Sequence, residues 1–270
     1  MPVSDPAASW SPLEPAAVER AVGASWAVRL LPTAGSTNEV AAADPVPRTV
    51  VVADHQTAGR GRLDRTWATP PGTALTFSLV LRPAVPDRHW PLLPLAVALG
   101  ASDGIAGLTG LRPELKWPND LLVGGRKLSG ILLERVPAEG GPVVIVGIGI
   151  NVGMSAGQLP VDGATSLAVE GVTVDRTNLL GALVVAVEVR IAELAADPAG
   201  LLAAYRSRCV TLGRQVRVHL PGGGELTGSA EDVDADGRLV VAGVAVGAGD
   251  VVHVRPLSPE TGAADGPPVT

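Results

Sequence analysis

The chain has 270 residues, of which 46% are hydrophobic and 18% are charged, so it carries enough apolar material for one large domain, with or without a small second one. Its formal net charge of −6 argues against non-specific nucleic-acid binding as the main function, and its single cysteine, Cys209, excludes an intramolecular disulfide and a thiolate metal cluster. Because the chain starts without a secretory signal and has no apolar run long enough to span a bilayer, we expect a cytoplasmic protein.

Helices and strands alternate in the predicted order of the first part of the chain. Apolar patterns and turn residues indicate a helix at 14–24, a strand at 26–31, a helix from Ser36 to about Asp44, a strand at 48–56, a loop at 57–72 and a strand at 73–82. Ser36 has the position of an N-cap, and Glu39 three residues later would complete a capping box. The loop at 57–72 has no apolar periodicity, and long loops in compact domains are often functional.

The middle of the chain predicts a second group of strands and then a long helical region. The expected elements are a helix at 90–107, two strands around a Gly-Gly turn within 115–136, a strand at 142–152, a glycine-bearing loop at 153–174 and helices across 176–206. Pro118 cannot donate to a strand ladder, so its segment should be a sheet edge, a bend or a bulge. Asp197-Pro198 should divide the helical region in two.

The character of the sequence changes after Cys209, where short apolar runs are separated by turn signals such as Asp236-Gly237. This pattern is typical of a small β-barrel. We therefore predict four parts: an N-terminal extension with a short helix at 1–25, a main α+β domain at 26–208, a small β domain at 209–256 and a disordered tail at 257–270.

Glycine and arginine alternate in the loop that follows Gln56, in the order Gly59-Arg60-Gly61-Arg62. Glycine permits close approach of the backbone to a ligand, and arginine offers two parallel donors to a phosphate or a carboxylate. Such a loop could close over an anion, although a solvated turn would have the same composition. No P-loop motif occurs in the chain.

The only two lysines of the chain, Lys116 and Lys127, lie eleven residues apart in a second polar stretch. Lysine is a compact point charge that arginine cannot freely replace. The segment Lys116-Trp117-Pro118-Asn119-Asp120 adds an aromatic ring, an amide and a carboxylate that could hold Mg²⁺ beside a triphosphate. The alternative is a strand end capped by a local Asn/Asp turn.

With these segments the chain resembles the biotin protein ligase family. Four segments match the family in order: Gly35–Asn38, Gln56–Arg62 with Trp67, Lys116–Asp120 with 126–132, and Gly147–Asn151. The resemblance covers about residues 26–255. It implies a mixed-sheet α+β domain that carries the catalytic and biotin- and ATP-binding residues, followed by an SH3-like β domain.

The resemblance also implies roles for individual residues. Those expected to bind biotin are Ser36, Thr37, Asn38, Gln56, Arg60, Gly61, Arg62, Lys127, Gly130 and Leu132. Those expected to bind ATP or the adenylate are Arg60, Arg62, Trp67, Lys116, Asn119, Lys127 and Asn151. Catalytic roles are implied for Lys127, Arg60, Arg62 and Asp120, with Lys127 bridging carboxylate and α-phosphate oxygens, and with Asp120 either holding Mg²⁺ or orienting a lysine. At Leu63-Asp64 the family often has glycine and basic residues, so the detailed electrostatics of the closed loop are not carried over from the family.

The implied activity has two half-reactions at one site. Biotin and ATP, with Mg²⁺, give biotinyl-5′-AMP and pyrophosphate, and the biotinyl group then passes to a lysine of a biotin carboxyl carrier domain of an acyl-CoA carboxylase. The loop at 59–67 is expected to close over the adenylate and exclude water. The sequence leaves open whether the protein is a monomer or a dimer.

Three other functions fit these segments less well. A lipoate or octanoate transferase has a related catalytic fold, and the Arg60–Arg62 and Lys116–Asp120 segments favour the biotin branch. A non-enzymatic protein that docks partners through its β domain is disfavoured by the density of polar residues in 56–67 and 116–130. A DNA-binding regulator is disfavoured by the net charge and because only about 25 residues precede the first predicted strand, too few for a helix-turn-helix module.

Overall fold

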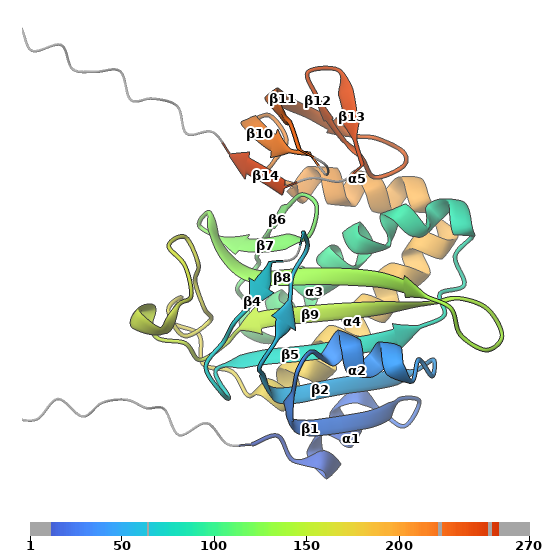
Figure 1. The fold of residues 1–270 in the computed structure, drawn as a ribbon, viewed down its shortest axis with the longest axis vertical. Coiled ribbons are helices and arrows are strands. Elements are labelled where there is room, and N and C mark those ends of the chain that lie inside the picture. Colours follow the sequence, from blue (N-terminus) through green and yellow to red (C-terminus); the bar gives the residue numbers. More distant parts are fainter. Residues whose placement is uncertain (1–11, 64, 221–222, 248–249, 254–270) are drawn as a thin grey trace, which may run out of the picture.

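The computed structural model describes residues 12–63, 65–220, 223–247 and 250–253. The predicted disordered tail at 257–270 and most of the stretch before the first helix lie outside these residues. Within them, the predicted order of helices and strands is largely confirmed (Figure 1).

Seven strands form one mixed sheet. Their spatial order is β1 (Ala27–Ala34), β2 (Thr49–Gln56), β5 (Ala74–Leu81), β9 (Val143–Asn151), β8 (Arg126–Val136), β7 (Asp120–Val123) and β6 (Glu114–Lys116). β1 pairs with β2 in parallel, and the other neighbours pair antiparallel. The α+β, mixed-sheet expectation is therefore confirmed.

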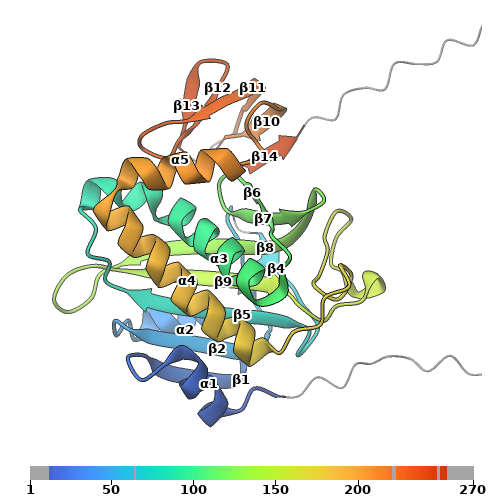
Figure 2. The same cartoon turned by 180° about the vertical axis from the view of Figure 1, so that it is seen from behind.

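Helices cover both faces of this sheet, but unequally. α1 (Pro15–Val22), α3 (Leu93–Thr109), α4 (Arg176–Ala196) and α5 (Pro198–Arg208) lie on the face seen in Figure 2, and α2 (Thr37–Ala43) lies on the opposite face (Figure 1). Phe77 of β5 packs in the large core on the face covered by α1, α3, α4 and α5. Val80 packs in the small core on the face covered by α2. Burial on both faces explains why β5 is an almost continuous apolar run.

The long helices begin and end where the sequence provides signals. Asp175 caps α4 by accepting from the backbone N–H of Asn178, and Asp197 caps α5 by accepting from that of Gly200. The division at Asp197-Pro198 is confirmed, because proline fits the first turn of α5 but not the interior of a longer helix.

Helix α3 is preceded by a 3-10 turn, η1 (Asp87–Leu92), and packs closely against α4. A Cβ on Gly100 would lie 2.7 Å from Cα of Val187 in α4, so glycine permits this close approach. By length and composition alone the stretch Asp87–Thr109 could cross a membrane, but 67% of its apolar window is buried inside the protein, as in a core helix.

Asp103 of α3 forms ion pairs with arginines of the two neighbouring helices, α4 and α5. Its carboxylate contacts Arg190 of α4 at 2.6 Å and Arg208 at the end of α5 at 2.8 Å. Burial by itself would raise the pKa of Asp103, but the hydrogen bonds and charges of these arginines outweigh burial and lower it. The carboxylate therefore stays ionised, and its ion pairs hold α3 against α4 and α5.

The last five strands form a separate antiparallel sheet. Their order is β13 (Val244–Val246), β12 (Leu239–Val241), β11 (Glu225–Val233), β10 (Gln215–His219) and β14 (Asp250–His253). This arrangement confirms the small β domain. The domain lies against the β6 end of the large sheet (Figure 1), where Trp117 Nε1 donates to the backbone oxygen of Gly237 at 3.0 Å.

Three details of the predicted elements were wrong. The stretch 57–72 is not a plain loop, because β3 (Gly59–Arg60) and β4 (Thr66–Trp67) pair in it as a short hairpin. The stretch 115–136 contains three strands, since edge strand β6 precedes the turn at Pro118. Ser36 is the N-cap of α2, but its side chain makes no capping bond, so there is no capping box.

Candidate functional site

A cavity of about 410 Å³ lies between the β3–β4 hairpin and the large sheet, a volume within the usual range for small-molecule sites. It brings together predicted residues that are far apart in sequence, namely Ser36, Thr37, Asn38, Gln56, Arg60, Gly61, Arg62, Trp67, Asn119, Asp120, Lys127, Gly130, Leu132 and Asn151. Lys116 is the one predicted site residue that does not line it. The four segments that match in sequence therefore meet in one cavity.

The floor of one end of the cavity is a hydrogen-bonded chain of buried polar side chains. Gln56 Oε1, at the end of β2, accepts from the backbone N–H of Thr37 at 2.7 Å and lies 3.1 Å from its hydroxyl. Ser78 of β5 lies 2.8 Å from the Thr37 hydroxyl and donates to Asn38 Oδ1 at 2.6 Å. Such a chain fixes donors and acceptors in place, as recognition of a neutral polar ring requires.

Asn38 is positioned by the sheet as much as by its own helix. A Cβ on Gly147 of β9 would lie 2.2 Å from Asn38 Oδ1, so only glycine leaves room for the amide. Asn38 Nδ2 donates to Glu134 Oε2 at 2.7 Å and to the backbone oxygen of Leu132 at 3.3 Å. Its donors are thus engaged by the protein, which favours a positioning role over a direct ligand contact.

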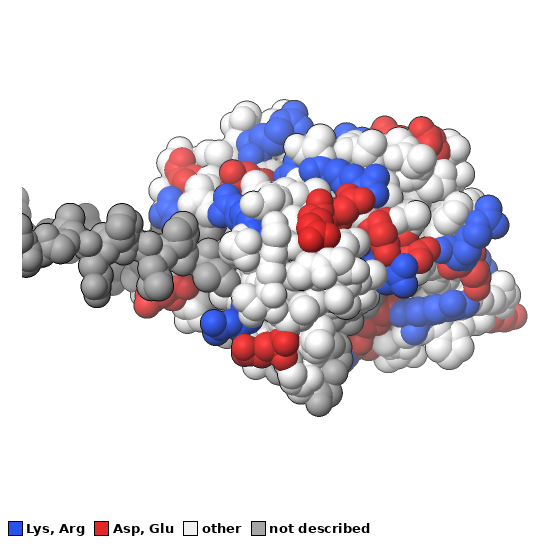
Figure 3. All heavy atoms as spheres, turned by 90° about the horizontal axis from the view of Figure 1, so that it is seen from above, with Lys and Arg blue, Asp and Glu red and all other residues white. Residues whose placement is uncertain are grey.

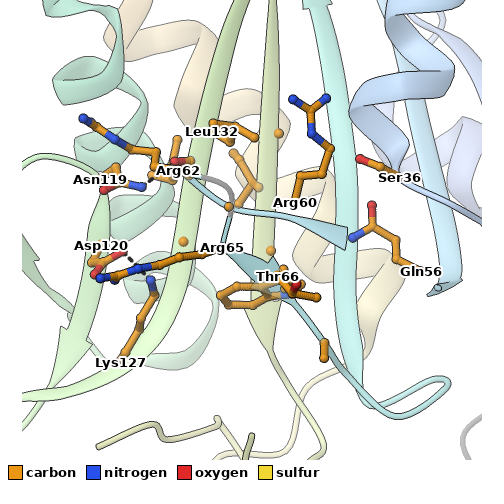
Figure 4. A pocket seen from close by; sticks show the side chains of 18 of the residues that line it. Ser36, Gln56, Arg60, Arg62, Arg65, Thr66, Asn119, Asp120, Lys127 and Leu132 are labelled. Atoms are coloured by element: carbon orange, nitrogen blue, oxygen red, sulfur yellow. Dashed lines mark hydrogen bonds and ion pairs between the residues drawn. The ribbon is translucent and has the colours of Figure 1, made fainter. Parts of the chain in front are cut away.

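The other end of the cavity is ionic. Asp120 at the start of β7 lies opposite Gly130 of β8 in the strand register, and its Oδ1 is 2.6 Å from Nζ of Lys127. Lys116 is more distant, with Nζ 4.0 Å from Asp120 Oδ2. Figure 4 shows Asp120, Lys127 and Arg65 gathered at this end, whereas Ser36, Gln56 and Arg60 lie at the other. The geometry supports the lysine-orienting role of Asp120.

Two glycines of the sheet make room for Trp67 of the β3–β4 hairpin. Gly130 of β8 and Gly149 of β9 are register partners, and a Cβ on them would lie 3.2 Å and 2.7 Å from ring atoms of Trp67. The Lys127 ammonium is 5.8 Å from the centre of the Trp67 ring, within the range of a cation–π contact. The Trp67 indole of β4 therefore lies directly on the sheet and beside the Lys127 ammonium.

The two remaining asparagines are tied to the backbone. Asn119 Nδ2 donates to the oxygen of Ile131 at 2.7 Å, and Asn151 Nδ2 donates to the oxygen of Thr165 at 2.8 Å. Asn151 Oδ1 and the indole N–H of Trp67 are buried with no hydrogen-bond partner among the described residues. Because an unpaired buried polar group is costly, both are candidates for ligand contacts.

No resident metal site is evident in the described residues. No group of three or more His, Cys, Asp or Glu side chains there is placed to hold an ion. Among the described residues that line the cavity, Asp120 is the acidic one, and it is already paired with Lys127. One paired carboxylate does not fit a protein-built magnesium centre, although Mg²⁺ is often bound mainly by substrate phosphates.

Charged side chains of both signs share the face above the C-terminal sheet. Figure 3 shows Lys and Arg interspersed with Asp and Glu over the face above the C-terminal sheet. An extended single-sign patch that would attract nucleic acid is not seen on that face.

Sequence reasoning missed several residues of the site. Ser78 and Glu134 belong to its polar network, and Pro160, Val161 and Ala164 of the second loop also line the cavity. Ser78 lies within an apolar strand, and a buried hydroxyl nearly always has a hydrogen-bond partner. The sequence therefore indicated that this serine contacts another polar group. The loop residues carry no chemical signature of their own.

The comparisons with known proteins agree with this geometry. The pattern of the biotin/lipoate A/B protein ligase family matches residues 32–151, and that of the biotin protein ligase C-terminal domain matches residues 211–254. The chain is 41% identical over 235 residues to the biotin–[acetyl-CoA-carboxylase] ligase of Mycobacterium tuberculosis, covering 82% of this chain and 86% of that protein. It is 35% identical over 218 residues to a bifunctional ligase/repressor of Bacillus spizizenii, covering 77% of this chain and 66% of that protein.

A solved structure shows the same fold. The biotin protein ligase from Aquifex aeolicus in complex with biotin and ATP is similar with a TM-score of 0.73 and 27% identity, covering 85% of this chain and 99% of that chain.

Proposed function

Because this chain belongs to the biotin protein ligases of the biotin/lipoate A/B protein ligase family, we propose that its cavity activates biotin with ATP and passes the biotinyl group to a lysine of a biotin carboxyl carrier domain. The observation that carries the proposal is the meeting of a neutral hydrogen-bonding end and a cationic end in one cavity. The first suits an uncharged ureido ring, and the second suits a carboxylate beside a polyphosphate.

The first half-reaction forms the mixed anhydride. A biotin carboxylate oxygen attacks the α-phosphorus of ATP, the bond to the bridging oxygen of pyrophosphate breaks, and pyrophosphate leaves. Two anions approach each other in this step, so positioned cations lower its barrier. Lys127, held by Asp120 at 2.6 Å, would bridge the carboxylate and the α-phosphate, and Arg62 of the hairpin would neutralise the remaining charge. Arg60 lies at the Gln56 end of the cavity and pairs with Glu134, so its catalytic contribution requires the hairpin to shift when the substrates bind.

The second half-reaction transfers the acyl group. The amine of the carrier lysine attacks the acyl carbon, the acyl–oxygen bond to AMP breaks, and the amine gives up a proton to solvent. Trp67 of the hairpin lines the cavity and would keep water from the anhydride until the carrier arrives. Ser36, Thr37, Gln56 and Gly130 would hold the biotin part throughout, and Asn119 and Asn151 would border the adenylate.

Mg²⁺ enters this proposal only with the nucleotide. The described residues do not build a metal site of their own, and Asp120 is engaged by Lys127. A bound ion would neutralise phosphate charge, and no step above depends on a protein ligand to it. A cytoplasmic location and the domain boundaries at 25/26, 208/209 and 256/257 also remain predictions.

The direct test is transfer to a carrier. The protein is incubated with ATP, labelled biotin and a purified biotin carboxyl carrier domain of an acyl-CoA carboxylase, and label on the carrier is measured. We expect ATP-dependent label on the wild-type carrier and none on a carrier whose target lysine is changed to arginine. Label on a lipoyl domain from lipoate, with none on the biotin carrier, would instead assign the chain to the lipoate branch.

A further inference from the structure

Glu134 joins the floor of the cavity to the lid that covers it. One carboxylate oxygen, Oε2, accepts from Asn38 Nδ2 at 2.7 Å. The other, Oε1, lies 3.2 Å from Nη2 of Arg60, which belongs to the lid strand β3. None of the motif matches includes Glu134, and the proposed chemistry gives it no role.

The position of Glu134 follows from the strand period. It comes two residues after Leu132 and four after Gly130 on β8, and alternate residues of a strand share a face. Glu134 therefore stands on the cavity side of the sheet, further along the strand than the ligand-lining residues. Its side chain is 28% exposed and that of Arg60 is 47% exposed, so water and salt reach the ion pair from the arginine side.

The lid has little backbone support from the rest of the protein. β3 and β4 form a sheet of only two strands, with pairs Gly59↔Trp67 and Arg60↔Thr66. The bond from Gly61 N–H to the oxygen of Arg65 also lies within the hairpin. A two-stranded hairpin is marginally stable by itself, so its place over the cavity depends on side-chain contacts with the sheet.

We propose that Glu134 is a positioning residue that latches the β3–β4 lid through Arg60. On the proposed function, the latch slows the escape of the adenylate before the carrier arrives. Because the same carboxylate holds Asn38, the lid is fastened to the side chain that shapes the biotin end of the cavity. The contact uses Nη2 of Arg60, and a guanidinium has five N–H donors, so Arg60 can also bind an anion.

The test separates formation of the adenylate from its retention. The variant Glu134→Gln keeps a carbonyl oxygen for Asn38 and removes the charge that holds Arg60. Glu139→Gln is the matched control, because it makes the same chemical change at an exposed turn beyond the end of β8. Each protein is loaded with biotin and α-labelled ATP, freed of excess ligand, and followed for loss of bound label without a carrier.

We expect Glu134→Gln to lose bound adenylate about two- to fivefold faster than wild type, the range expected for a partly exposed ion pair, with the rate of adenylate formation measured alongside. Glu139→Gln should match wild type in both rates. Unchanged or slower loss from Glu134→Gln would overturn the latch. Failure of the wild-type protein to form any adenylate would instead overturn the proposed function.

A second measurement needs no variant and distinguishes a latch from a purely structural role. Raising the ionic strength from about 0.1 M to about 1 M shortens the screening length from about 10 Å to about 3 Å. Loss of the adenylate from wild type should then accelerate, whereas loss from Glu134→Gln should change less. Equal salt dependence in the two proteins would contradict the proposal even if Glu134→Gln were less stable.

Discussion

Lys127 is positioned by Asp120 and Gly130, which the strand register places beside it. Asp120 contacts its ammonium at 2.6 Å, and a Cβ on Gly130 would lie 3.4 Å from the same nitrogen. The carboxylate orients the ammonium and the glycine leaves it room. In a chain with 21 basic residues and only two lysines, this arrangement suits a compact ammonium better than a planar guanidinium.

Removing this ammonium should slow adenylate formation. For Lys127→Ala we expect a loss on the order of 100-fold or more, because one preorganised charge is typically worth about 3–4 kcal/mol in such a step. The measurement is pyrophosphate release with biotin and ATP. Arg126→Ala is the neighbouring control, since Arg126 is exposed and pairs with Glu170, and it should stay within a few fold of wild type. A near-normal rate for Lys127→Ala would refute the central role of Lys127.

The motif residues could be predicted from sequence, whereas their supports could not. The cavity collects the predicted residues except Lys116, which lies behind Asp120 at 4.0 Å. Ser78 and Glu134 were missed because a single polar residue in or near an apolar strand does not reveal which neighbour it meets. Only the register of β5, β9 and β8 brings these side chains to Asn38.

Among the elements, the lid hairpin depends on a flat, side-chain-free surface beneath it. Trp67 of β4 lies against Gly149 and Gly130, which are register partners on adjacent strands. A strand interior normally favours side chains that pack, so glycine there indicates that something else approaches closely. Here it is the indole of the lid.

Adding one methyl group to this surface should prevent the lid from closing. In Gly149→Ala the Cβ would lie 2.7 Å from Trp67 Cε2, and a displacement on the order of 1 Å in a catalytic site can cost about 100-fold. We expect a loss of about 10- to 100-fold in adenylate formation, measured as biotin-dependent pyrophosphate release. The control Gly157→Ala meets no atom within 4 Å and should behave as wild type. Equal activity of the two variants would show that Trp67 does not cover the site in this way.

Most elements were predictable because their local patterns and their tertiary surroundings agree. Helices α4 and α5 are preceded by Asp175 and Asp197, residue types that favour N-caps and whose side chains do cap these helices. The hairpin β3–β4 was not predictable, because strands of two residues have no periodicity of their own. Nor was the missing capping bond of Ser36, whose side chain Figure 4 shows at the Gln56 and Arg60 end of the cavity.

Across the whole molecule, the small β domain supports the strand that leads into the ionic end of the cavity. Trp117 donates through its indole to Gly237 at 3.0 Å and through its backbone N–H to the Thr211 hydroxyl at 3.1 Å. The Thr211 hydroxyl also lies 3.3 Å from Nε2 of His253. Since this hydroxyl accepts from Trp117, its own proton is available to a neutral His253, so the contact depends on the charge state of the histidine.

This contact predicts a pH dependence of stability. Burial, and then the charges of Lys116 and Arg214, lower the pKa of His253 to about 4 from 6.5. Between these values the unfolded chain binds a proton that the folded protein does not, so stability falls as pH falls from about 6.5 to about 4. The melting temperature of His253→Gln should decline less steeply over this window than that of wild type. His89→Gln is the control and should keep the wild-type pH dependence. A wild-type slope in His253→Gln would contradict the assignment of this pH dependence to His253.

The central claim is that this chain activates biotin with ATP. The most direct measurement is the exchange of labelled pyrophosphate into ATP, with biotin in one sample and lipoate in a parallel one, because exchange reports the reversible first step without any carrier. Exchange with biotin and none with lipoate is the predicted result. Exchange with lipoate alone, or none with either acid, would contradict the account.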